Sequence, residues 1–340
     1  MRLRRADRSV PGLRRVRRGR GFAYLDADGE RIDEQETLER IEALTIPPAW
    51  REVWICPDPR GHLQATGIDA AGRTQYLYHP IWREQRDRQK FREMEGFGQS
   101  LPRLRRKVHR ALSASDELSR ERVAAGATRL LDIGLFRVGS EQYADDETGG
   151  FGLATLTREH LRWRDGHAVF DYLGKSGVRR VLEIGDPDSV ALLRQLCRRR
   201  AGPPELMSYR NGRSWCRLGS DGINDYIKEN AGEHYSAKDF RTWNATAVAA
   251  ARLDYFERRP LPRARSRQRV IRAVVKEVAE MLGNTPAVAR RAYIDPRVLD
   301  SYLSGETIGV DIEPVGTLSE VGDRRRREVE RAVLKMLADG

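Results

Sequence analysis

The feature that most constrains the fold is a change of pattern at Pro80. Residues 21–80 contain short runs of β-branched, aromatic and alternating residues, separated by turn sequences such as Asp28-Gly29, and this predicts antiparallel strands. After Pro80 the chain has long segments with apolar residues at helical spacing, which predict amphipathic helices. The sequence therefore predicts an α+β protein with a small β-rich domain, residues 1–90, and a larger, mainly helical domain, residues 91–340.

Turn residues and periodicity define the expected elements. Four strands are expected before Pro80, at 22–25, 53–56, 62–68 and 74–78, with one helix at 36–44. A three-stranded β-island is expected in the helical domain, at 161–163, 169–173 and 178–184, because Asp165-Gly166 and Gly174-Lys175-Ser176-Gly177 are turn sequences. Gly96-Phe97-Gly98 predicts a hinge between two helices. Helices are expected at 81–94, 101–112, 116–134, 189–200, 222–230, 236–253, 265–282, 285–292 and 320–337.

The charge balance indicates a polyanionic partner. The chain carries 62 Lys and Arg against 50 Asp and Glu, a net charge of +12, and such an excess in a folded protein favours nucleic acid. Residues 1–20 hold nine Arg and one Asp, and they are expected to form a flexible arm that contacts phosphates or a solvated tail. In the last helix, Arg324 to Arg327 are expected to face solvent or phosphate.

Several other classes of protein are excluded. No apolar run approaches the roughly 18 residues of a membrane helix, and no hydrophobic secretory segment follows the basic start, so an intracellular protein is expected. Cys56, Cys197 and Cys216 are too widely spaced for a disulfide scaffold or a thiolate zinc site. Gly174-Lys175-Ser176 lacks the Gly that a phosphate-binding loop needs five residues earlier, where Val169 stands. We therefore expect no metal and no ATP.

Four cationic or polar positions stand out from the background of solvated charge. Arg137 lies between apolar neighbours just after a helix, and a buried Arg needs an anion, which a structural carboxylate can also supply. Lys175 is at the tip of a Gly-flanked turn. Ser236 and Asp239 form a capping box, which places Lys238 and Arg241 in a first helical turn beside backbone N–H groups suited to phosphate.

The segment from Leu282 to Pro286 stops one helix and restarts another. Pro286 is in the first turn of the new helix, and Tyr293 lies at the end of that helix, before Ile294-Asp295-Pro296. A Tyr in this position is either a residue at the edge of the core or a functional group.

Taken together, these segments resemble the type IB DNA topoisomerases, above all the small poxvirus-like and bacterial enzymes. The residues that carry the resemblance are Phe136 to Tyr143, the turn Gly174 to Gly177, Lys238 to Trp243, Leu282 to Pro286 and Tyr293 to Pro296; Ile46 to Trp50 and Gln75 to Tyr78 match the family's N-terminal domain. The resemblance implies a catalytic set of Arg137, Lys175, Arg241, Asn284 and Tyr293, with Tyr293 as nucleophile and Lys175 as general acid. Asn284 stands where the poxvirus and nuclear enzymes have His, as is usual in the bacterial branch.

The resemblance also implies an activity and a partner. It implies a monomeric enzyme that closes on double-stranded DNA as a C-shaped clamp and relaxes supercoils through a 3′-phosphotyrosyl intermediate, in the bacterial cytoplasm at the nucleoid. No metal, ATP or other cofactor is implied. Tyr76 and Tyr78 lie on an alternating strand and are candidates either for the groove of DNA or for the core. The implied DNA contacts are Gln75, Tyr76, Tyr78, Tyr143, Ser220 and Lys238.

Two other functions remain open at this stage. A tyrosine recombinase shares the Arg, Lys, Arg and Tyr chemistry but usually has a His-x-x-Arg box, and here Lys238 stands three residues before Arg241. A DNA-binding protein without catalytic activity would explain the charge but not the ordered motifs.

Overall fold

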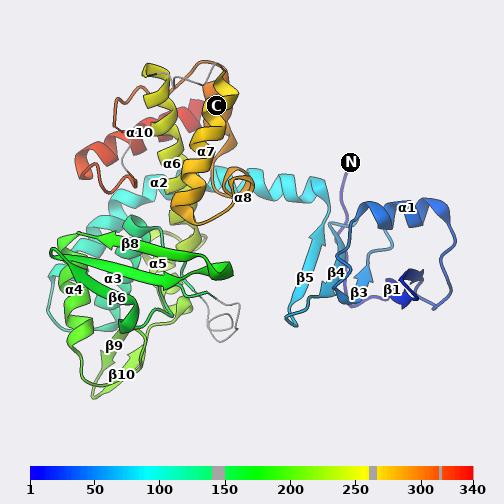
Figure 1. Ribbon diagram of the computed structural model, residues 1–340, viewed down its shortest axis with the longest axis horizontal. Coiled ribbons are helices and arrows are strands. Elements are labelled where there is room, and N and C mark those ends of the chain that lie inside the picture. Colours follow the sequence, from blue (N-terminus) through cyan, green and yellow to red (C-terminus); the bar gives the residue numbers. More distant parts are fainter. Residues whose placement is uncertain (140–149, 260–265, 314–315, 340) are drawn as a thin grey trace. The chain divides into compact units, whose positions relative to one another are not determined.

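The computed structural model describes residues 1–139, 150–259, 266–313 and 316–339 (Figure 1). The chain divides into two compact units, Met1–Lys90 and Phe91–Gly340, and each is described by itself. The first unit is built on an antiparallel sheet, and helices dominate the second. The predicted α+β class is confirmed. No helix in the described ranges is long and apolar enough to cross a membrane.

The first unit is a five-stranded antiparallel sheet with the order β2-β1-β3-β4-β5. Its core is small and contains Ile41 and Ile55, both almost fully buried. The strands are β1 (Leu13–Arg18), β2 (Gly21–Leu25), β3 (Arg51–Ile55), β4 (Leu63–Ile68) and β5 (Thr74–Tyr78), and the helix is α1 (Gln35–Ala43).

Strand β1 contradicts the prediction of a flexible arm or solvated tail for residues 13–18. It pairs with β2 on one side and β3 on the other, and Leu13 is buried in the core. The Arg15 guanidinium donates hydrogen bonds to the carbonyl oxygens of Ile46 (3.1 Å), Pro47 (3.0 Å) and Trp50 (2.7 Å). The high Arg content hid this strand from the sequence analysis. The face of β1 that packs on the core carries one apolar side chain, Leu13, and Arg15, whose charge is satisfied by the three carbonyls.

Helix α2 (Pro80–Ser113) is continuous through Gly96 and Gly98, so the predicted hinge is wrong. A Cβ atom at Gly98 would lie 2.3 Å from the Trp243 ring, and one at Gly96 would lie 2.5 Å from the Tyr235 hydroxyl. These glycines therefore allow large aromatic side chains to pack directly on the helix backbone.

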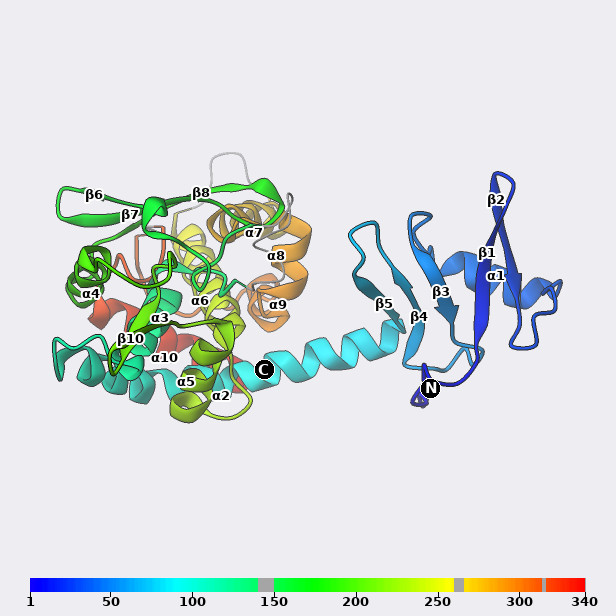
Figure 2. The ribbon, with the colours of Figure 1, turned by 90° about the horizontal axis from the view of Figure 1, so that it is seen from below.

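The second unit has a helical core and two small sheets. Helix α6 packs against α3, α7, α9 and α10, while the antiparallel sheet β6-β7-β8 contacts α3 and α4 (Figures 1 and 2). The pair β9–β10 and helix α9 were not foreseen. The elements after α2 are α3 (Arg120–Gly134), β6 (Leu161–Arg164), β7 (His167–Leu173), β8 (Arg179–Ile184), α4 (Pro187–Arg198), β9 (Ser208–Asn211), β10 (Ser214–Arg217), α5 (Ser220–Ala231), α6 (Ala237–Arg258), α7 (Arg267–Leu282), α8 (Pro286–Ala292), α9 (Pro296–Leu303) and α10 (Asp323–Asp339).

A buried ion-pair cluster anchors α10 to α2, α3 and α6. Arg326 is 2% exposed and pairs with Asp132 on α3 and Glu330 on α10. Arg105 on α2 pairs with the same two carboxylates at 2.8 and 2.6 Å. The Trp243 indole on α6 donates to Glu330 at 3.3 Å. The expectation that Arg324 to Arg327 face solvent or phosphate is thus wrong for Arg326, which has carboxylate partners inside the fold.

Candidate active site

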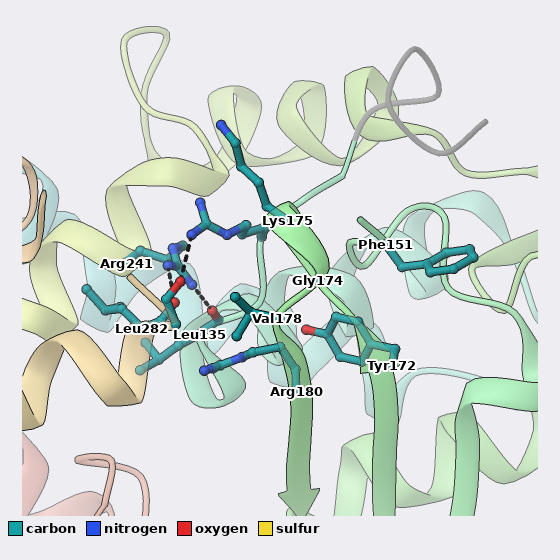
Figure 3. Close-up of a pocket in the computed structure, with 11 residues that line it drawn as sticks. Leu135, Phe151, Tyr172, Gly174, Lys175, Val178, Arg180, Arg241 and Leu282 are labelled. Carbon is teal, nitrogen blue, oxygen red and sulfur yellow. Dashed lines mark hydrogen bonds between the residues drawn. The ribbon is translucent and has the colours of Figure 1, made fainter. Parts of the chain in front are cut away.

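A small pocket forms where the turn between β7 and β8 meets the C-terminal ends of α3 and α7 and the first turns of α6. Figure 3 shows its lining, which includes Arg137, Lys175, Arg180 and Arg241. Within the described ranges, none of the three arginines has a carboxylate at ion-pair distance. The pocket is therefore a cluster of cations whose charge the described protein groups leave uncompensated, an arrangement that favours an anionic ligand.

Arg137 follows a sharp change of direction at the end of α3. Leu135 caps this helix in the left-handed conformation, φ 55°, and Phe136 then packs against Phe170 of β7, with ring centroids 4.9 Å apart. These contacts direct Arg137 to the turn after α7. Its guanidinium donates to the Asn284 Oδ1 at 2.5 Å and weakly to a backbone carbonyl at 3.3 Å. The structural carboxylate considered as an alternative partner for Arg137 is not found among the described residues.

Arg241 is held by the capping box predicted at the start of α6. The Ser236 N–H donates to Asp239 at 2.7 Å, and the capping box is confirmed. Arg241 is 3% exposed and donates to the carbonyl oxygens of Leu135 and Leu282. Burial, reinforced by repulsion from Arg137, lowers the pKa of Arg241 to about 10.

Two buried N–H donors, one on a residue that lines the pocket and one on the residue that follows its lining residue Gly283, have no partner among the described residues. They are the Arg241 Nε and the Asn284 Nδ2. The Asn284 amide is oriented by Arg137, because only its oxygen can accept that hydrogen bond. Buried donors without partners are rare because each has lost its hydration without compensation. Both donors suit an oxygen atom of a bound anion.

Tyr293 caps the C-terminal end of α8 and is 8% exposed. Its ring centroid lies 5.3 Å from the Arg241 guanidinium carbon. Burial acts to raise the pKa of Tyr293, but the charges of Arg241, Arg137 and Lys238 outweigh it, and the net pKa is lowered. The environment therefore favours the phenolate, which is the nucleophilic form.

Lys175 lies at the rim of the pocket and is exposed. The turn that carries it is closed by a hydrogen bond from the Gly174 N–H to the Val178 carbonyl at 2.8 Å, which confirms a hairpin turn instead of a phosphate-binding loop. Ser176 adopts a left-handed conformation in this turn, φ 64°. Figure 3 shows the Lys175 side chain extending away from Arg180 into open space.

The residues expected to contact DNA are scattered over different elements. Tyr76 and Tyr78 are exposed on β5 and stack with ring centroids 6.1 Å apart. Gln75 points to the opposite face of this strand, where it donates to Asp69 at 2.9 Å. The structure thus separates Gln75 from the two tyrosines.

The remaining three candidates belong to the second unit. Lys238 is exposed in the first turn of α6, and its charge contributes to the lowered pKa of Tyr293. Ser220 is the first residue of α5. Tyr143 lies outside the described residues.

Sequence reasoning missed Arg180 and Tyr172, which form a cross-strand pair of β7 and β8. The available signal was the alternation of β8, where Arg180 shares the inward face with Leu182 and Ile184. An Arg on the apolar face of a strand is unusual, and it indicates a buried partner or ligand.

Known proteins match this chain over a segment that includes the residues of the pocket. The family model for the eukaryotic DNA topoisomerase I catalytic core matches residues 80–303, and that for the bacterial DNA topoisomerase IB N-terminal domain matches residues 21–69. DNA topoisomerase 1B of Acanthamoeba polyphaga mimivirus is 27% identical over 327 residues, 94% of this chain and 97% of its own length. DNA topoisomerase 1B of vaccinia virus (strain Copenhagen) is 23% identical over 276 residues, 79% of this chain and 82% of its own. The matched catalytic core contains every residue that lines the pocket.

Proposed function

The chain belongs to the type IB DNA topoisomerases, a family of type I topoisomerase enzymes, and on this premise we propose how it acts. It relaxes supercoiled double-stranded DNA by cutting one strand, letting the cut strand rotate about the intact one, and resealing it. The catalytic residues are Tyr293 as nucleophile, Lys175 as general acid, and Arg137, Arg241 and Asn284 as ligands of the scissile phosphate.

The reaction is a pair of transesterifications. The phenolate oxygen of Tyr293 attacks the scissile phosphorus, and the bond between phosphorus and the 5′ oxygen breaks. The 3′ end is then held as a phosphotyrosyl ester, and the 5′ oxygen leaves with a proton from Lys175. The 5′ hydroxyl later attacks the same phosphorus, returns the proton and releases Tyr293. Since one phosphate diester replaces another in each step, resealing needs no ATP, and the cations supply charge stabilisation that a metal ion would otherwise provide.

The observation that carries this proposal is a pair of buried donors without partners, one on Arg241 next to Tyr293 and one on Asn284 next to Arg137. Attack on phosphorus places additional negative charge on the non-bridging oxygens. The Arg241 Nε and the Asn284 Nδ2 are buried donors without partners among the described residues, and Arg137 contacts Asn284 directly. Asn284 has no titrating proton, so its role is hydrogen bonding alone.

Lys175 requires the substrate to complete its environment. The side chain is exposed in the free protein, and a bound duplex would bring the leaving 5′ oxygen to it.

The proposed DNA contacts come from both units. Lys238 and Ser220, at the starts of two helices, would contact phosphates. In the first unit, the exposed pair Tyr76 and Tyr78 would contact the duplex. Arg137, Lys175 and Arg241 gather in one pocket without a residue from a second copy, and we propose a monomer as the active form.

The decisive experiment compares Tyr293→Phe with the unaltered protein on supercoiled plasmid, in EDTA and without ATP. The unaltered protein should relax the plasmid and form a covalent DNA adduct that survives denaturant, and Tyr293→Phe should do neither while still binding DNA. Tyr226→Phe is the matched control, because Tyr226 is also a buried tyrosine of the second unit but lies on α5. An adduct formed by Tyr293→Phe would refute the assignment. Joining of strands from two different duplexes would favour the recombinase.

A further inference from the structure

Arg180 lies in the pocket but is not among the residues proposed above for the chemistry. It stands opposite Tyr172 on the neighbouring strand. Its two terminal nitrogens donate to the carbonyl oxygens of Glu280 (3.2 Å) and Met281 (2.7 Å). These carbonyls belong to the last turn of α7, where a cation is favoured, and the Glu280 carbonyl also accepts a hydrogen bond from the Gly283 N–H at 3.0 Å. Arg180 therefore joins the β7–β8 hairpin to the C-terminal end of α7.

The residue that ends α7, Gly283, is fitted to Arg180. Gly283 has φ +61°, and a Cβ atom there would lie 2.9 Å from the Arg180 Nη1. Its positive φ favours glycine, and a Cβ atom there would push the Arg180 guanidinium from its present position. The next residue is Asn284, whose Oδ1 accepts the hydrogen bond from Arg137. Arg180 thus supports the turn that presents Asn284 to Arg137.

We propose that Arg180 is a positioning residue that holds the Gly283–Asn284 turn against the β7–β8 hairpin, so that Asn284 and Arg137 keep the geometry required for strand cleavage. This inference rests on the function proposed above. The hairpin carries Lys175, and the helix that leads to Tyr293 begins just after the turn. Arg180 therefore connects the two sides of the pocket. Its terminal nitrogens donate to backbone carbonyls, and its Nε, unlike that of Arg241, is not a buried donor without a partner. In the proposed role Arg180 therefore acts on the phosphate through Asn284 and not by contact.

A double-mutant cycle tests whether Arg180 acts through Asn284. Single-turnover cleavage of a labelled duplex is measured for the unaltered protein, Arg180→Met, Asn284→Ala and the double variant. Asn284→Ala removes one donor to the transition state and should slow cleavage about 100-fold. Arg180→Met displaces that donor and should slow cleavage about 30-fold. The double variant should be slowed only about 100-fold, because the two changes disable the same interaction. Independent effects, which multiply to about 3,000-fold, would overturn the proposal.

Arg179→Met is the matched control for the loss of charge. Arg179 is the preceding residue, and its exposed guanidinium pairs with Asp171 on the other face of the sheet. This variant should cleave at the rate of the unaltered protein, and Arg180→Lys, which keeps the charge and one donor, should fall between Arg180→Met and the unaltered protein. Thermal midpoints of all variants are measured so that rates are compared for folded protein.

The salt dependence of DNA binding supplies a second readout. Each phosphate contact contributes about 0.9 to the slope of log K against log salt. A positioning role predicts an unchanged slope for Arg180→Met, and a slope smaller by about 0.9 would assign Arg180 to direct phosphate contact and overturn the proposal. Absence of cleavage by the unaltered protein would refute the proposed function itself, and the inference with it. Cleavage by the unaltered protein with independent effects in the cycle would refute the inference alone.

Discussion

Replacing Asp132 with Asn should destabilise the second unit by about 3–5 kcal/mol, the usual cost of leaving a buried charge without its partner. Asp132 is 3% exposed and accepts hydrogen bonds from Arg105 (2.8 and 3.0 Å) and Arg326 (2.5 Å), with Arg129 at 3.8 Å. The amide keeps the shape of the side chain but removes its charge. The guanidinium groups of Arg105, Arg129 and Arg326 would then have only two carboxylate partners, Glu330 and Asp186. One positive charge would be left without a negative partner.

The size of the effect can be measured by thermal unfolding. For a unit of this size, each kcal/mol lowers the midpoint by roughly 2–4 °C, so a decrease of about 6–20 °C is expected at pH 7. The double variant Asp132→Asn/Arg326→Met restores the charge balance and should recover much of this loss. Asp311→Asn is the control, since Asp311 pairs with Arg259 at the surface and its loss should leave the midpoint nearly unchanged.

The pH dependence of stability gives an independent check that the ionised Asp132 carboxylate stabilises the fold. Burial acts to raise the pKa of Asp132, but Arg105 and Arg326 outweigh it and hold the pKa far below its usual value. A carboxyl with a lowered folded pKa stabilises the protein fully above its unfolded pKa, near ~4, and progressively less as pH falls below it. The midpoint of the unaltered protein should therefore fall more steeply below about pH 4 than that of Asp132→Asn. Equal midpoints at pH 7, or a double variant less stable than Asp132→Asn, would refute this account of the cluster.

Three further predictions follow from the structure. Gly98→Ala should lower the thermal midpoint of the second unit, because its Cβ would lie 2.3 Å from the Trp243 ring and overpacking costs about 1–3 kcal/mol; an unchanged midpoint in calorimetry would contradict this packing. Lys175→Ala should cleave ordinary DNA slowly but a substrate with a 5′ sulfur leaving group far faster, since sulfur needs little protonation; equal rates on both would remove Lys175 from the general-acid role. Arg17→Ser/Arg18→Ser, which alters exposed residues of β1 without removing the strand, should reduce the salt slope of DNA binding by up to about 1.8 if both bind phosphate, and an unchanged slope would show that neither does.

Much of the fold was predictable because its turns are encoded locally. Asp165-Gly166 has both residues at positive φ in the structure, 48° and 83°, as a two-residue hairpin turn requires, and this set the register of the β-island. Strand β1 was missed because its Arg content resembles a solvated tail. The hinge at Gly96 to Gly98 was wrong because a glycine pair indicates flexibility or close packing equally well. Only the positions of Tyr235 and Trp243, far along the chain, decide between these two interpretations.

The site was predictable only where a motif carried it. The capping box at Ser236 follows from sequence alone and is confirmed, and the family identified from the ordered motifs is confirmed by the comparisons. The catalytic roles stay predictions. Arg180 escaped notice because its importance depends on the backbone carbonyls of Glu280 and Met281, which have no sequence signature. Every residue has a backbone carbonyl, so the sequence does not indicate which distant carbonyls an Arg will contact.

The unpartnered donors of Arg241 and Asn284 give the free protein a preorganised site. Because these groups are already dehydrated and fixed, little reorganisation is needed when a phosphate arrives, and this is the condition under which polar groups stabilise a transition state most. The free protein, however, must carry the energetic cost of unsatisfied donors, and the packing around it has to supply that stability. In the proposed function, a DNA phosphate bound in the pocket would supply the missing partners, so binding should raise the resistance of the second unit to unfolding by mass action. The same two side chains therefore favour catalysis and lower the stability of the protein without DNA.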